Sequence, residues 1–183
     1  MKAFLIHGSY GHPEENWFPW LKQKLEEAGW KVFVPTFPTP KNQSLNTWQK
    51  AFAPYRSEID ETSIFIGHSL GPAFILSILE DLDFQIPTCF FVAGFTGNLN
   101  NPEFDEINKT IADKNFNWDQ IKANCSHFNL YHSDNDPYVP LTKAEALSQQ
   151  LNSKLTIIQN AGHFNKSSSY NDFIGLLEDI QST

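Results

Sequence analysis

Positive charge is scarce in this chain. Its 183 residues include 13 lysines and arginines against 21 aspartates and glutamates, so the net charge is -8 when the histidines are neutral. The basic side chains are scattered along the sequence and form no cluster that could neutralise a row of phosphates. We therefore expect no nucleic acid among its partners.

Cysteine is rare too, and long apolar runs are absent. The two cysteines, Cys89 and Cys125, cannot form a dense disulfide framework. The N-terminal apolar run, Ala3–Ile6, is too short for the core of a signal peptide, and no run approaches the ~20 residues of a membrane helix. These absences favour a soluble, cytoplasmic protein that does not bind a membrane.

The common cofactor and metal motifs are missing as well. The sequence contains no His-Glu-x-x-His and no Cys/His pairs at zinc-binding spacing. The loop at His7–Pro13 carries glycines but matches neither glycine-rich phosphate-binding motif. We therefore expect neither a metal nor a cofactor.

Short apolar runs alternate with amphipathic segments along most of the chain. Strands are expected at Ala3–Ile6, Lys31–Val34, Thr62–Ile66, Thr88–Ala93, Ser126–Tyr131 and Lys154–Gln159. Helices are expected at Glu14–Ala28, from Ser44 to about Ser57, at Leu70–Leu82, from Asn117 or Asp119, at Thr142–Leu151 and at Ser169–Ile180. Pro19 belongs near a first turn, so the alternative is that the first helix begins there. This alternation predicts an α/β fold, a three-layer α/β/α sandwich with a mostly or wholly parallel six-stranded sheet, in one domain over residues 1–183.

Two stretches break the regular pattern. Pro54 should kink or end the helix that Ser44 caps, because proline lacks the N–H that continues a helix. From Gly94 to Asp113 the sequence is irregular, and we expect at most a short helix near Glu103–Asn108. This second stretch is the one candidate for a lid.

The third expected strand leads directly into Gly67-His68-Ser69-Leu70-Gly71, a G-x-S-x-G sequence followed by an expected helix. Such a strand–turn–helix context is typical of a nucleophile elbow, where a sharp, strained turn exposes the serine hydroxyl. Larger side chains two positions on either side would collide, which accounts for Gly67 and Gly71. The alternative is an ordinary strand–helix turn, because short motifs also match by chance.

A serine nucleophile needs a base to accept its proton and an acid to orient that base. Asp136 follows the fifth expected strand and His163 follows the sixth, so serine, acid and histidine each lie after a strand, in the order of an α/β-hydrolase. Asp134 is the alternative acid, unless it caps its own loop. We predict a catalytic triad of Ser69, Asp136 and His163.

The negative oxygen formed during acyl transfer requires two N–H donors. One donor should be the backbone of Leu70, directly after the serine and at the start of a helix. The other should come from the loop after the first strand, where we favour Ser9, with Tyr10 as the alternative. This loop could instead be a simple glycine-bearing turn.

Aromatic residues near the expected strand ends are candidates for substrate binding: Tyr10, Phe95, Tyr138 and Phe164. Trp17 is a further candidate, although packing in the core is at least as plausible a role for it. No long insertion separates the fourth and fifth strands, so we expect an open, shallow cleft that takes small or exposed acyl groups.

These segments together resemble the small serine hydrolases of the retinoblastoma-binding protein nine/YdeN family, in the α/β-hydrolase superfamily. The resemblance runs over nearly the whole chain. It is carried by the N-terminal His-Gly loop, the run Glu-Glu-Asn-Trp-Phe-Pro-Trp-Leu, the elbow, Asp136-Pro137 with Val139-Pro140, and Gly162-His163-Phe164.

The resemblance implies a reduced α/β-hydrolase fold without a cap domain, and a triad at Ser69, Asp136 and His163. Pro72 departs from the family pattern, in which a small residue is commoner, but proline is tolerated in the first helical turn. Binding of retinoblastoma protein is not implied, because no Leu-x-Cys-x-Glu motif surrounds either cysteine.

We therefore expect a serine hydrolase of the carboxylesterase type, which cleaves small carboxylic esters or related acyl substrates through an acyl-enzyme. Amide and thioester substrates would use the same residues, so the sequence does not separate these classes. The alternative is a catalytically weak or inactive member that acts as a protein- or ligand-binding regulatory module. The expected partner is a small acyl substrate, and nothing in the sequence identifies a protein partner.

Overall fold

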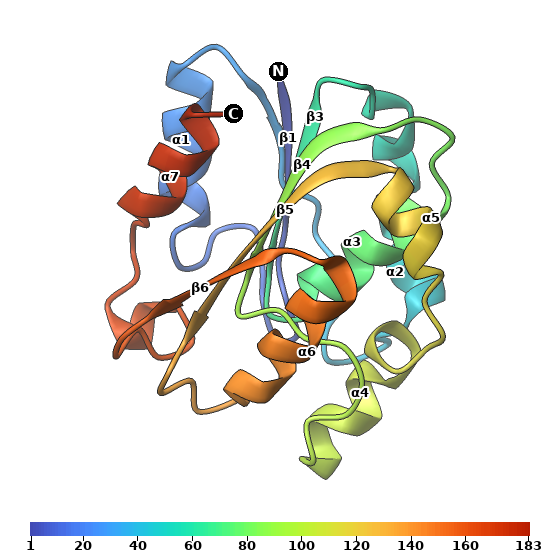
Figure 1. Ribbon diagram of the computed structural model, residues 1–183, viewed down its shortest axis with the longest axis vertical. Helices are drawn as coiled ribbons and strands as arrows, with labels where there is room; N and C mark the ends of the chain where they lie inside the picture. The colour runs from blue at the N-terminus through green and yellow to red at the C-terminus, as the bar shows by residue number, and fades with distance from the viewer.

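The computed structural model describes residues 1–183 and contains a six-stranded sheet in the order β2-β1-β3-β4-β5-β6 (Figure 1). Every neighbouring pair of strands is parallel, as predicted. The strands are β1 (Lys2–Ile6), β2 (Lys31–Phe33), β3 (Ser63–His68), β4 (Ile86–Val92), β5 (Cys125–Ser133) and β6 (Lys154–Ile158). Because all strands run the same way, their carboxyl ends meet at one edge of the sheet, where ligands bind in such folds.

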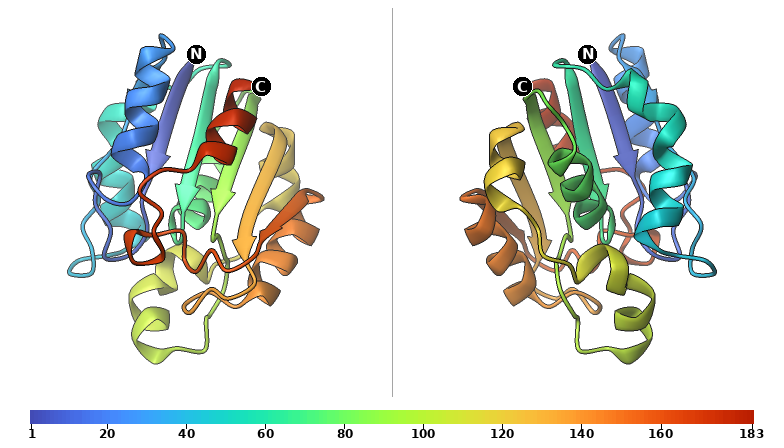
Figure 2. Two further views of the ribbon diagram at one scale, coloured as in Figure 1. Left: turned by 90° about the vertical axis from the view of Figure 1, so that its left-hand side faces the viewer. Right: turned by 90° about the vertical axis from the view of Figure 1, so that its right-hand side faces the viewer.

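Helices cover both faces of the sheet, which confirms the three-layer prediction (Figures 1 and 2). One face carries α1 (Phe18–Glu27) and α7 (Ile174–Gln181). The other carries α2 (Leu45–Phe52), α3 (Gly71–Glu80), α5 (Trp118–Ala123) and α6 (Leu141–Leu151). A further helix, α4 (Pro102–Ala112), lies beyond the carboxyl ends of the strands (Figure 2). None of these helices has the length and apolar character needed to cross a membrane.

The central strands β3 and β4 are mostly apolar because both of their sides are covered. Every residue of β3 is buried. Since successive side chains of a strand point to opposite faces, Phe65 packs in the core beneath α2 and α3, and Ile64 and Ile66 pack beneath α1 and α7. Phe65 also stacks on Phe4 of β1, with ring centroids 4.9 Å apart.

Proline and capping residues set the helix ends near the predicted positions. The Ser44 hydroxyl accepts the Thr47 N–H at 3.2 Å, and the Thr47 hydroxyl accepts the Ser44 N–H at 3.0 Å, so both residues cap α2. The helix then tightens into a 3-10 turn, η1 (Ala53–Glu58), which contains Pro54. This change of helix type is the disruption that Pro54 predicts.

The prediction for residues 94–113 was too cautious. The short helix expected near Glu103–Asn108 forms, but it is longer, because α4 has 11 residues. Asn101 caps it by accepting the N–H groups of Glu103 and Phe104, and Pro102 occupies its first turn. The Asn-Pro pair is a helix-start signal that the apparent irregularity of the segment concealed.

Left-handed or extended residues precede the first and the last helix, and the last helix starts later than predicted. The first helix begins at Phe18, next to Pro19, as the alternative start at the proline predicted, and Asn16 before it adopts a left-handed conformation with φ 51°. The last begins at Ile174, since Ser169 has φ 66° and Phe173 is extended with φ -148°. Residues in these conformations cannot continue an α-helix.

A tight backbone contact at the start of α3 gives a test of this packing. An alanine Cβ at Gly71 would lie 2.2 Å from the carbonyl oxygen of Ile6, so Gly71→Ala must push α3 away from β1. We expect this change to lower the free energy of unfolding by roughly 1–3 kcal/mol. Urea denaturation followed by circular dichroism measures it.

Gly175→Ala is the matched control, because nothing lies within 4 Å of the added methyl group and Gly175 lies inside α7. It should stabilise the fold by up to ~1 kcal/mol, the helix-propensity difference between glycine and alanine. Equal effects of the two substitutions would contradict the backbone contact at Gly71.

Candidate active site

The turn between β3 and α3 has the geometry of a nucleophile elbow. Ser69 adopts a left-handed conformation with φ 59°, which is strained for a residue other than glycine. A Cβ at Gly67 would lie 2.7 Å from the Pro72 nitrogen, and one at Gly71 would meet the Ile6 carbonyl. The two glycines therefore allow the close packing that holds the serine in this turn.

An acid–base pair lies next to this serine. The Nδ1 atom of His163 is 2.7 Å from Oδ2 of Asp136, and the other Asp136 oxygen accepts the N–H groups of Tyr138 and Val139. The Asp136 side chain is fully buried, and 10% of the His163 side chain is exposed. Burial raises the pKa of the Asp136 carboxyl, but the hydrogen bonds from His163 and the two backbone N–H groups outweigh it and hold the pKa below its usual value.

An ionised Asp136 fixes the tautomer of the imidazole. Because a carboxylate only accepts hydrogen bonds, Nδ1 of His163 carries the proton and Nε2 is left free to act as a base. His163 and Ser69 line the same pocket, although no hydrogen bond joins the Ser69 hydroxyl to the ring in this unliganded structure. Catalytic hydrogen bonds of this kind often tighten only when substrate binds.

The two candidate acids have different partners. Asp134 is exposed, and its carboxylate accepts the N–H of Asn160 at 2.8 Å. The side chains on either side of it, Ser133 and Asn135, accept the N–H groups of Ala161 and Gly162. Three consecutive residues, the last of β5 and the two after it, thus tie down the loop that carries His163, and Asp136 alone reaches its ring.

Two backbone N–H groups near Ser69 have no acceptor. The N–H groups of Ser9 and Leu70 donate no hydrogen bond within the chain, whereas the N–H of Tyr10 donates to the Thr39 hydroxyl at 2.7 Å. Of these two candidates in the loop, Ser9 is therefore the one with a free backbone N–H. A Cβ at Gly8 would lie 2.6 Å from Cβ of Ser69 and 3.1 Å from the Leu70 nitrogen, so this loop packs directly on the elbow.

Three buried histidines hold the backbone of the site loops, and the sequence alone did not reveal this pattern. Nε2 of His7 accepts the Phe37 N–H at 3.1 Å, so its Nδ1–H donates to the Gly8 carbonyl at 2.9 Å. His68 donates from Nε2 to the His163 carbonyl at 2.8 Å, and His132 donates from Nε2 to the Val139 carbonyl at 2.9 Å.

All three rings are neutral at physiological pH. Burial lowers the pKa of His7 to about 4 and that of His68 to about 3, and it also lowers the pKa of His132. A neutral ring keeps one donor and one acceptor nitrogen, which matches the partners of His7. These histidines therefore support the loops and do not compete with His163 as a base.

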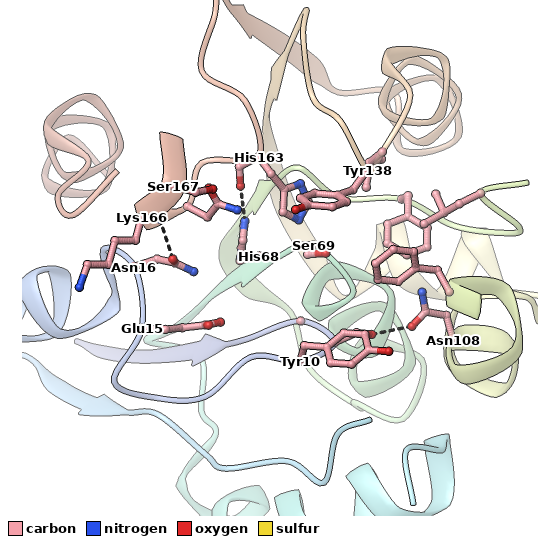
Figure 3. Close-up of a pocket in the computed structure, with 17 residues that line it drawn as sticks. Tyr10, Glu15, Asn16, His68, Ser69, Asn108, Tyr138, His163, Lys166 and Ser167 are labelled. Atoms are coloured by element: carbon pink, nitrogen blue, oxygen red, sulfur yellow. Dashed lines mark hydrogen bonds between the residues drawn. The ribbon is translucent and has the colours of Figure 1, made fainter. Parts of the chain in front are cut away.

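A pocket of about 400 Å³ opens over Ser69 and His163 (Figure 3). Tyr10, Phe95 and Tyr138 line it, as three of the four aromatic predictions expected. Phe164 does not line the pocket, so that prediction was wrong. Its φ of 50° turns the chain after His163, and its ring is fully buried and stacks on Phe173.

Trp17 is also buried in that core, where its indole N–H donates to the Phe164 carbonyl at 3.0 Å. The sequence had left a core role open for this residue, and the structure assigns it that role.

Helix α4 forms one wall of the pocket. The Ser9 hydroxyl donates to Asn108 at 2.6 Å, and the Tyr10 hydroxyl donates to Glu103 at 2.7 Å. Phe104 meets the Tyr138 ring edge-on, with centroids 6.0 Å apart. The stretch that the sequence suggested as a lid is thus an ordered helix bonded to the loop that carries Ser9.

Comparison with known proteins places this arrangement in a family. Residues 3–178 match the family model described as serine hydrolase. YdeN of Bacillus subtilis is 28% identical over 165 residues, which are 89% of this chain and 85% of YdeN. Serine hydrolase RBBP9 of Rattus norvegicus is 25% identical over 98% of this chain and 95% of its own length.

The crystal structure of YdeN superposes with a TM-score of 0.91 at 26% identity, and covers 99% of this chain and 97% of the other. The methylesterase MES16 of Arabidopsis shares the fold with a TM-score of 0.71, full coverage of both chains and 12% identity. Because the family model matches residues 3–178 of its 183 residues, this chain belongs to the serine hydrolase family.

Proposed function

We propose that this serine hydrolase cleaves small carboxylic esters through an acyl-enzyme on Ser69. The observation that carries the proposal is the 2.7 Å contact between Asp136 and His163 beside a strained serine in a pocket. Membership of the family supports a hydrolase, and the free N–H groups of Ser9 and Leu70 support acyl transfer in particular.

In the first half of the reaction, Nε2 of His163 accepts the Ser69 proton while the serine oxygen attacks the ester carbonyl carbon. The carbonyl oxygen becomes negative and receives hydrogen bonds from the N–H groups of Ser9 and Leu70. Asp136 stabilises the imidazolium that forms. The bond to the alcohol oxygen then breaks, His163 protonates that oxygen, and the acyl group stays on Ser69.

In the second half, water replaces the alcohol. His163 accepts a proton from the water molecule while the water oxygen attacks the acyl carbon. The acyl carbonyl oxygen again becomes negative and accepts hydrogen bonds from the same two N–H groups. The bond to Ser69 breaks, His163 returns the proton to the serine oxygen, and the carboxylic acid leaves.

Replacing the nucleophile tests the proposal. Ser69→Ala should lower kcat for p-nitrophenyl acetate by roughly a thousandfold or more, because no acyl-enzyme can form. It should also abolish labelling by a fluorophosphonate, followed by intact mass spectrometry. Ser167→Ala, which changes an exposed serine of the same pocket, should retain labelling.

Full esterase activity in a folded Ser69→Ala protein would contradict the proposal. Wild-type protein that neither hydrolyses esters nor reacts with the fluorophosphonate would favour the regulatory binding module instead.

The two aspartates give a second test with a built-in control. Asp136→Asn should lower kcat by roughly a thousandfold or more, since an amide no longer fixes the productive tautomer of His163. Asp134→Asn removes the same charge two residues away but changes only an exposed loop contact, so kcat should stay within a few-fold of wild type. Steady-state kinetics at neutral pH distinguish the two aspartates, and a larger loss at Asp134 would refute the assignment.

The size of the pocket predicts the acyl preference. A volume of about 400 Å³ is near the lower end of the range of small-molecule sites, and it must hold both parts of the ester. In a series of p-nitrophenyl esters of increasing acyl length, kcat/KM should be highest for short chains. A steady rise toward long chains would be inconsistent with this site.

A further inference from the structure

The pocket lining contains both polar and apolar side chains. Figure 3 shows Glu15, Asn16 and Lys166 on one side of Ser69, and Tyr138 and Asn108 on the other. The apolar side chains of Phe95, Leu99, Phe104 and Tyr138 make up what we call the apolar wall. Polar side chains form the polar wall, from Glu15 and Asn16 before α1 and from residues 165–167 after His163. The proposed hydrolysis steps use none of the polar wall, so its chemistry needs a separate explanation.

Two loops build the polar wall and are joined to each other. The side chain of Asn16 accepts the N–H of Lys166 at 2.8 Å. The loop that carries Lys166 also follows directly after His163, the residue that protonates the departing alcohol in the proposed reaction. The polar wall therefore lies next to His163 in the chain and lines the same pocket.

Glu15 is the half-buried charged group of this wall. Its carboxylate lies against Gly11, because a Cβ added to Gly11 would be 2.4 Å from Oε1 of Glu15. It takes part in none of the ion pairs of the chain, so no lysine or arginine lies within 4.0 Å of it. Burial raises the pKa of Glu15, and the nearby His12 and His163 offset this only in part.

Lys166 is the other charged residue of the wall, but its side chain is exposed. Water and salt screen an exposed ammonium strongly, whereas a half-buried carboxylate keeps more of its field within the pocket. Glu15 is therefore the charged group of the polar wall whose field within the pocket is screened least.

We propose that Glu15 is a specificity-determining residue that selects carboxylic esters whose alcohol part carries a positive charge. In such a substrate the carbonyl lies at Ser69, the acyl chain packs against the apolar wall, and the ammonium group lies by the Glu15 carboxylate. This inference rests on the proposed function, because it places the acyl part and the alcohol part of an ester substrate on opposite sides of Ser69.

A pair of esters with the same shape and different charge tests it. Acetylcholine carries a quaternary ammonium, and 3,3-dimethylbutyl acetate carries a neutral tert-butyl group in the same place. The wild-type protein should show a kcat/KM about tenfold higher for acetylcholine, as expected for a charge near a half-buried partner. The ratio within one protein cancels any loss of activity that affects both esters.

Glu15→Gln should reduce that ratio to about one. Glu14→Gln is the matched control, because it removes the same charge from an exposed neighbour outside the pocket and should leave the ratio unchanged. Hydrolysis of p-nitrophenyl acetate by each protein shows whether its fold and reaction machinery are intact.

The outcomes separate the two proposals. Wild-type protein that hydrolyses p-nitrophenyl acetate but does not favour acetylcholine, or a ratio that Glu15→Gln leaves unchanged, would overturn the role of Glu15 and leave ester hydrolysis standing. Failure to hydrolyse any of the three esters would overturn the proposed function itself.

Discussion

Close contact of backbone with backbone around Ser69 is the constraint on which the site depends. Glycines at positions 8, 67 and 71 bring the first loop, the elbow and the start of α3 within van der Waals distance, and a Cβ at any of them would meet atoms at 3 Å or less. This packing holds Ser69 in the left-handed conformation, which a serine backbone does not favour by itself. Because Gly8 packs against the elbow, the loop that carries Ser9 lies beside Leu70, and both residues have a free N–H.

Neutral, buried histidines hold the loops of the site through hydrogen bonds to backbone carbonyls. His7 holds the Gly8 carbonyl, His68 holds the His163 carbonyl, and His132 holds the Val139 carbonyl. Since burial lowers the pKa of each ring, these bonds do not change with pH in the physiological range. The only histidine paired with a carboxylate is His163.

The sequence predicted the parts of the protein that local chemistry specifies. Apolar runs, cap residues and turn glycines identified the six parallel strands, the capped start of α2 and the elbow, because each depends on residues close together in the chain. The order of Ser69, Asp136 and His163 predicted that they share one edge of the sheet, and the structure brings Asp136 into contact with His163.

Other features depend on contacts between distant segments. Phe164 faces the core and not the pocket because a single left-handed residue reverses the side-chain direction after His163. The supporting histidines and the free carboxylate of Glu15 were not predictable, since their partners or their neighbours lie in other loops. Helix α4 was underestimated because polar residues hid a start signal at Asn101 and Pro102.

The central claim is that Ser69 carries the acyl group during turnover. Rapid acid quenching of the protein mixed with p-nitrophenyl acetate, followed by intact and peptide mass spectrometry, measures this directly. The account predicts a transient acetyl adduct that maps to Ser69 and disappears as the ester is consumed. Turnover of the ester without any adduct, or with an adduct on a different residue, would contradict it.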